Sequence, residues 1–147
     1  MTERQAMFFI CDDVLIALNG KYTVSGIYTG DIIINQDPTQ LLQLVVMFEI
    51  RTPIDNPFRT LVLHVSLPGE ESPRRLELPP FPSPPKLPER TAILHRFPFL
   101  ITNPILRSGP IEVKVLHEEG ELSAGKQWVV TVQQAQAMVT AQQAVAH

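Results

Sequence analysis

Three aspartates near the start of the chain are the side chains best suited to bind a metal ion. Asp12 and Asp13 follow an apolar run, and Asp31 lies beyond an Asn19-Gly20 pair that could fold the two arms together. Loop carboxylates can gather a hard cation such as Ca²⁺. However, adjacent strand residues point to opposite faces, and the D-x-D-x-D-G ligand pattern is missing. We therefore expect no metal and no other cofactor, with Asp13 facing solvent and Asp12 accepting backbone hydrogen bonds at a bulge.

The histidines and the single cysteine give a weaker signal for chemistry. His64, His95 and His117 would form a three-imidazole metal site only if their strands were adjacent and aligned, and no pair has a short ligand spacing. Cys11 lies in an apolar strand, where thiols are usually buried and inert, which disfavours a Cys11–His95 nucleophilic pair. No phosphate loop, G-x-S-x-G elbow or H-E-x-x-H motif is present. We therefore favour a binding protein over an enzyme, and the enzyme alternative stays open because a hydrolase would need only two suitably spaced carboxylates.

A Pro-rich segment, residues 79–88, is the first candidate for binding a partner protein. A preformed left-handed extended helix loses little entropy on docking, and residues 85–90 fit a P-x-x-P-x-R pattern. The candidate contact residues are Phe81, Pro82, Pro85, Lys86, Pro88 and Arg90. The alternative is a stiff connection that crosses from one sheet to another, with Phe81 pinning it to the core.

Residues 133–147 are the second candidate, because their composition changes to Ala, Gln, Val, Thr and Met, and residues 133–146 carry no charge. Such a segment favours a short helix when packed and a frayed tail when not. Met138 and Val139 could pack on a second copy of the chain or on an open sheet edge, whereas many termini are disordered. The sequence thus predicts a protein partner or self-association into a homo-oligomer.

Two other binding functions remain open. Tyr22, Tyr28, Trp128 and Asp31 could share an exposed face that binds a small ligand or a carbohydrate, or that supports weak hydrolysis. Aromatic residues at alternating strand positions are more often part of the core. A Ca²⁺-dependent module built on the three aspartates is the other alternative.

The elements that position these residues are short strands with alternating apolar side chains. Residues 42–50 place apolar side chains at every even position, and residues 61–67 do so at every odd position. Asn19-Gly20 tolerates the positive φ of a type I′ turn and predicts a hairpin. Further strands are expected at 74–78, 91–101, 111–116 and 127–132. The pattern predicts an all-β fold: a two-layer antiparallel β-sandwich of about seven to eight strands over residues 1–132, with a short C-terminal helix or tail.

Composition excludes several classes of partner. The net charge is −3 and the 12 basic residues are scattered, so we expect no nucleic-acid binding. No apolar run approaches the roughly 20 residues that span a bilayer, and the N-terminal apolar run is short for a secretion signal. A single cysteine fits a reducing compartment. We therefore expect a cytoplasmic protein that binds no membrane.

The segments Cys11-Asp12-Asp13-Val14, Asn19-Gly20-Lys21-Tyr22 and Gly26-Ile27-Tyr28 together resemble the opening of a family of small uncharacterised bacterial proteins. The likeness covers about a quarter of the chain, and residues 61–69 and 109–116 look like later strands of that family. The resemblance implies a small β-sandwich domain of unassigned function. It implies no catalytic residue.

Overall fold

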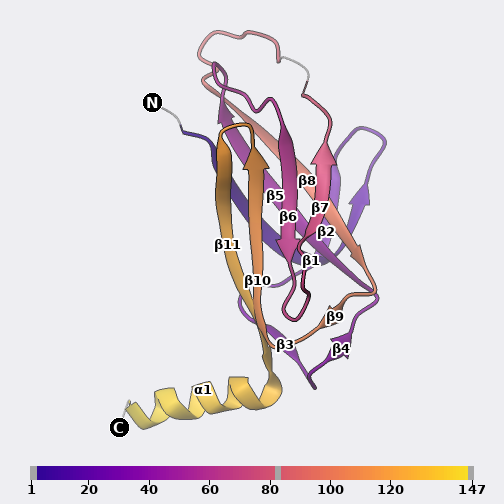
Figure 1. The fold of residues 1–147 in the computed structure, drawn as a ribbon, viewed down its shortest axis with the longest axis vertical. Helices are drawn as coiled ribbons and strands as arrows, with labels where there is room; N and C mark the ends of the chain where they lie inside the picture. The colour runs from indigo at the N-terminus through magenta and orange to yellow at the C-terminus, as the bar shows by residue number, and fades with distance from the viewer. Residues whose placement is uncertain (1–2, 82–83, 146–147) are drawn as a thin grey trace.

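The computed structural model describes residues 3–81 and 84–145, and it is mostly β with one helix at its end (Figure 1). The predicted all-β class is therefore confirmed. The elements are β1 (Gln5–Ile16), β2 (Tyr22–Ile27), β3 (Ile32–Ile34), β4 (Thr39–Gln40), β5 (Gln43–Pro53), β6 (Leu61–Ser66), β7 (Arg74–Leu78), β8 (Ala92–Thr102), β9 (Ile105–Leu106), β10 (Gly109–His117), β11 (Gly120–Thr131) and α1 (Val132–Val145).

Most of these strands form two sheets. One sheet has the order β2-β1-β5-β8 and is antiparallel throughout, and the other has the order β3-β11-β10-β6-β7. The pair β4-β9 forms a small ladder at one end. β3 differs from the antiparallel expectation because it pairs with β11 in parallel. It enters this sheet after the chain has crossed from β2 in the first sheet, so no hairpin fixes its direction.

The main hydrophobic core contains side chains from both larger sheets. From β5 it takes Leu44, Val46, Phe48 and Ile50, as the alternating pattern predicts, and from β6 and β10 it takes the apolar odd positions. Because successive strand residues point to opposite faces, each of these strands presents one row to this core.

β5 is buried on both faces, although its alternating pattern predicts only one buried face. Val45 and Met47 point away from the main core, yet both are buried, and they form a second cluster with Cys11. Tyr22 and Val24 of β2 pack against this cluster. The periodic pattern could not show this, because the cover comes from a neighbouring hairpin and not from β5 itself.

The hairpin predicted at Asn19-Gly20 is confirmed as β1 and β2, but its turn is not type I′. Only Gly20 has a left-handed backbone, with φ of 78°, whereas a type I′ turn needs positive φ at both central residues. Gly20 N–H donates to the Ala17 carbonyl, and Ala17 N–H donates to the Lys21 carbonyl. The loop is thus one residue longer than expected, and a glycine occupies its left-handed position.

Gly26 allows the two arms of the hairpin to approach closely. Its φ is 69°, and a Cβ there would lie 2.7 Å from the Asp12 Cγ. The Asp12 carboxylate occupies this space and accepts a hydrogen bond of 2.7 Å from the Tyr28 hydroxyl. Burial, the bond to Asp12 and the charge of Asp12 raise the pKa of Tyr28 to about 12.

Replacing Gly26 by alanine tests this close approach. We expect Gly26→Ala to lower the free energy of unfolding by about 2 kcal/mol or more, because the new Cβ meets both a left-handed backbone and the Asp12 carboxylate. Gly20→Ala is the matched control, since its φ is also positive but no atom lies within 4 Å of its Cβ position. It should cost only about 1 kcal/mol. Equal losses in urea denaturation would contradict this account.

Candidate functional site

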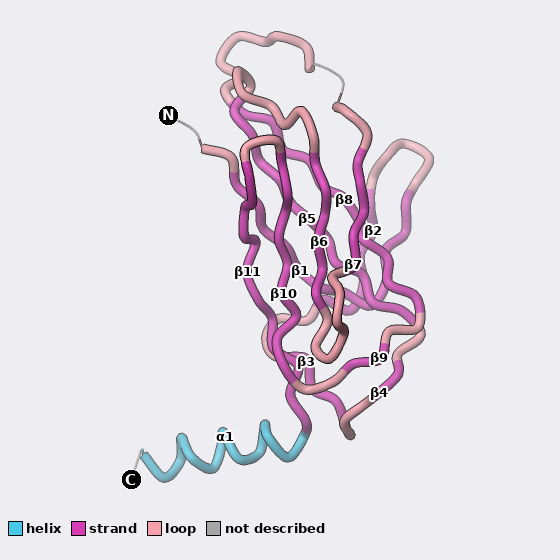
Figure 2. The backbone as a smooth tube through the Cα atoms, viewed as in Figure 1, coloured by secondary structure: helices cyan, strands magenta, loops and turns pink. Residues whose placement is uncertain are grey.

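The helix α1 is the most unusual surface feature of the described chain. It projects from the end of β11 away from the two sheets (Figure 2), and none of its side chains is buried. Its start is fixed locally: Gln134 N–H donates to the Thr131 Oγ1, and Thr131 N–H donates to the Gln134 Oε1. This reciprocal capping box explains why a helix begins directly after a strand.

An apolar groove lies between α1 and the edge strand β3. We call it the tail groove; it is lined by Ile33, Val132, Ala135, Gln136, Val139 and Thr140. Ile33 and Val139 are each more than half exposed. Of the two residues of the tail that were predicted to bind a partner, Val139 lines this groove, whereas Met138 is exposed and does not line it.

The Pro-rich segment connects β7, an edge strand of the five-stranded sheet, to β8, an edge strand of the other sheet. The Phe81 ring stacks on His95 at 4.6 Å and on Phe97 at 5.4 Å, so it packs against β8 within the chain. Pro82 lies outside the described residues. The placement of Phe81 corresponds to the alternative of a pinned, stiff connection.

The P-x-x-P-x-R pattern does not form one continuous extended helix. Arg90 N–H donates to the Leu87 carbonyl, and Glu89 has φ of 68°, so the chain turns between Pro88 and Arg90. Pro85 and Lys86 precede this turn. The backbone therefore changes direction between Pro85 and Arg90, so the two residues do not lie along one extended helix.

The aspartates do not gather. The Asp13 Oδ1 accepts hydrogen bonds from Val14 N–H and from the Gln43 Nε2, on the face opposite to the Asp12 carboxylate. Asp31 lies in a separate hollow. Within residues 3–81 and 84–145, no three His, Cys, Asp or Glu side chains are placed to hold a metal ion.

The histidines and Cys11 are also apart. His95 is in the four-stranded sheet, and it aligns with Ile50 of β5, whereas Cys11 aligns with Val45. Five residues along a strand separate these rows by about 16 Å. His64 and His117 lie on β6 and β10 of the other sheet, where His64 aligns with Lys114.

Tyr28, Asp31 and Trp128 line one shallow hollow of about 400 Å³, together with Lys126 and Gln127. The Gln127 Nε2 donates to the carbonyls of Tyr28 and Gly30, which braces the wall of the hollow. Trp128 is 52% exposed. Tyr22, the fourth residue of the predicted ligand-binding set, packs instead against the cluster around Cys11.

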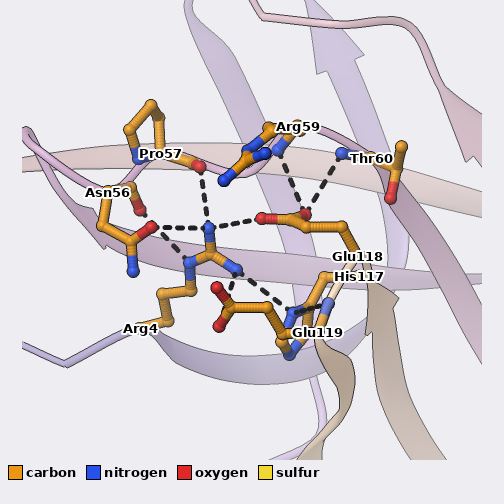
Figure 3. Close-up of polar contacts among 8 residues, drawn as sticks. All are labelled: Arg4, Asn56, Pro57, Arg59, Thr60, His117, Glu118 and Glu119. Carbon is orange, nitrogen blue, oxygen red and sulfur yellow. Dashed lines mark hydrogen bonds and ion pairs between the residues drawn. The ribbon is translucent and has the colours of Figure 1, made fainter.

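A polar cluster around Arg4 was not predicted from the sequence. The Arg4 side chain is only 7% exposed, and its guanidinium donates to the Glu118 carboxylate, the Asn56 side chain and the Pro57 carbonyl (Figure 3). It also lies 4.6 Å from the centre of the Phe58 ring. The cluster joins the start of β1 to the β5–β6 loop and the β10–β11 turn.

Both oxygens of Glu118 are occupied within this cluster. Oε1 accepts from Arg4, and Oε2 accepts from the N–H groups of Arg59 and Thr60. Burial acts to raise the pKa of Glu118, but these bonds and one from its own backbone outweigh burial and lower the pKa to about 2. Arg4 also bonds to the Nδ1 of His117, which therefore acts as an acceptor. Because its polar groups are hydrogen-bonded to one another, we interpret the cluster as one that stabilises the fold.

Comparison of the chain with protein-family models, curated proteins and solved structures found no match. Among the described residues, no helix is long and apolar enough to cross a membrane.

Glu118 should make stability depend on pH in a defined window. Its folded pKa lies below the ordinary value of 4.5, so its contribution is complete above about pH 4.5 and is lost as pH falls toward 2. We expect Glu118→Gln to lower the free energy of unfolding by about 2 to 3 kcal/mol at pH 7, and by much less near pH 2. Urea denaturation at several pH values measures this.

Glu119→Gln is the matched control, because its side chain is 59% exposed and its oxygen lies 3.8 Å from Arg4. It should change the free energy by less than about 1 kcal/mol at any pH. A loss for Glu118→Gln that stays constant from pH 7 to pH 2 would contradict the role given to Glu118.

Proposed function

We propose that this chain is a non-enzymatic β-sandwich module that acts by binding protein, and that it self-associates through α1 and β3. The observation that carries the proposal is a capped helix without a buried side chain. An isolated helix of about 14 residues is marginal in water, so most helices gain stability from packing. A second copy of the chain supplies a surface for this packing.

A second copy is the occupant that best fits the charge of this region. The helix contains only Val, Gln, Ala, Met and Thr, so two helices bring no like charges together. In a two-fold arrangement each helix would lie against the tail groove of the other copy. Val139 and Ile33 would then be buried in both copies. Four alanines in the helix favour close approach of the partner.

The architecture proposed for the module is a two-layer sandwich formed by the two larger sheets. The shared main core and the repeated crossing of the chain between the sheets support this arrangement. Eight strands of five or more residues would form its framework. The resemblance to a family of small bacterial β-sandwich proteins agrees with it. A net charge of −3 and one unpaired cysteine favour a cytoplasmic protein that binds neither nucleic acid nor membrane.

A charge in the tail groove tests self-association. We expect the full chain to form a concentration-dependent dimer in size-exclusion light scattering, and we expect Val139→Glu to shift it toward monomer, because a carboxylate would be buried in an apolar interface. Gln134→Glu is the control: it adds the same charge in the first turn, where the helix dipole favours it. A monomer at every concentration would refute self-association, as would equal dissociation by both variants.

A second candidate function is binding of a carbohydrate or another small polar ligand in the Trp128 hollow. Three of the four residues predicted for such a site line this hollow, and the exposed indole offers a stacking surface beside Asp31 and Lys126. Trp128 is the sole tryptophan, so its fluorescence reports directly on the hollow. We expect a saccharide to change this fluorescence saturably and Asp31→Asn to weaken the effect. Unchanged emission across a panel of neutral and acidic saccharides would remove this candidate.

A further inference from the structure

Three basic side chains form a row across the five-stranded sheet. Arg75 of β7 aligns with His64 of β6, and His64 aligns with Lys114 of β10. Their neighbours along the chain, such as Leu63 and Val113, belong to the main core. Because strand residues alternate between faces, the row therefore lies on the outward face of the sheet.

His64 is the unusual member of the row. It is only 8% exposed, and neither of its ring nitrogens has a hydrogen-bond partner among the described residues. A buried polar group without a partner costs about 1 to 3 kcal/mol, so such groups are rare in folded proteins. An aliphatic residue would fill this position without that cost.

Two positive charges and one negative charge act on the His64 imidazole. Burial lowers the pKa of His64, and the charges of Arg75 and Lys114 lower it further, whereas the charge of Glu121 acts to raise it. Lys114 pairs with Glu121 at 3.2 Å, but no ion pair of Arg75 is recorded within the described residues. Glu77 and Glu112 lie on the same outward face as the row, at the next position of that face, aligned with Val62 and Ser66 respectively. Arg75 and Lys114 each lie opposite His64, so protonating the imidazole would place three positive charges in one row unless an anion lies among them.

We propose that Arg75, His64 and Lys114 bind a phosphate group, either as free inorganic phosphate or as a small phosphate monoester. A guanidinium presents paired N–H donors to phosphate oxygens, and an ammonium and an imidazolium N–H add charge-assisted bonds. Ser123 of β11 aligns with Lys114 and extends the row with a hydroxyl donor. The phosphate would give the His64 nitrogens the acceptor that the chain itself does not provide. Arg75 and Lys114 are long and flexible, so they can move aside to admit it.

The test is NMR of the histidine ring resonances during titration at constant ionic strength. We expect inorganic phosphate or glycerol 2-phosphate to shift the His64 resonances saturably, with a dissociation constant of about 1 mM. Bound phosphate should also raise the pKa of His64, because it favours the charged imidazole. The ligand that binds more tightly distinguishes free phosphate from a monoester.

Arg75→Gln should weaken the binding by about tenfold, since it removes a charge-assisted donor pair from an exposed strand position. Lys126→Gln is the matched control, because Lys126 aligns with Glu112 on the same sheet but outside the row. It should leave the affinity unchanged within about twofold. Unmoved His64 resonances at about 50 mM of both ligands would overturn the proposal. Equal weakening by the two substitutions would also overturn it, because it would show diffuse attraction and not a site.

Discussion

Burial of β5 on both faces is the constraint on which the rest of the fold depends. Its even positions enter the core shared by both sheets, and Val45 and Met47 are covered on the other side by the β1–β2 hairpin. Each fully buried apolar side chain contributes about 1.5 to 3 kcal/mol. β5 gains this on its second face because side chains of β1 and β2, its neighbours in the same sheet, pack against Val45 and Met47. The Gly26–Asp12 contact lets β2 lie close to β1 and so holds the two strands of the hairpin together.

Two buried polar side chains differ in whether the chain supplies them with hydrogen-bond partners. Arg4 is almost fully enclosed, and its guanidinium meets acceptors from two separate connections, so the charge is compensated where it lies. His64 is enclosed to a similar degree but finds no acceptor within the described chain. The first arrangement closes one end of the sheets. The second leaves the His64 nitrogens without a partner from the described chain, which is why we propose a phosphate there.

The features proposed to act in binding lie outside the shared core. The helix α1 contributes no side chain to that core, and the row of Arg75, His64 and Lys114 faces away from it. A rigid strand framework therefore carries surfaces whose substitution should change binding more than folding. The proposed binding surfaces differ in this from the Arg4 cluster, whose polar groups bond to one another and connect segments of the chain.

Local patterns in the sequence determined the class of the fold, the β1–β2 hairpin and the inward rows of β5 and β6, because alternation and turn chemistry act over a few residues. The helix start was also readable, since Thr131 and Gln134 have capping-box spacing. Tertiary structure decided the rest. The second face of β5, the Arg4–Glu118 contact and the Arg75–His64–Lys114 row join residues that are distant along the chain. Strand order and register determine which of these distant residues come into contact, and the conformational preferences of short segments do not specify them.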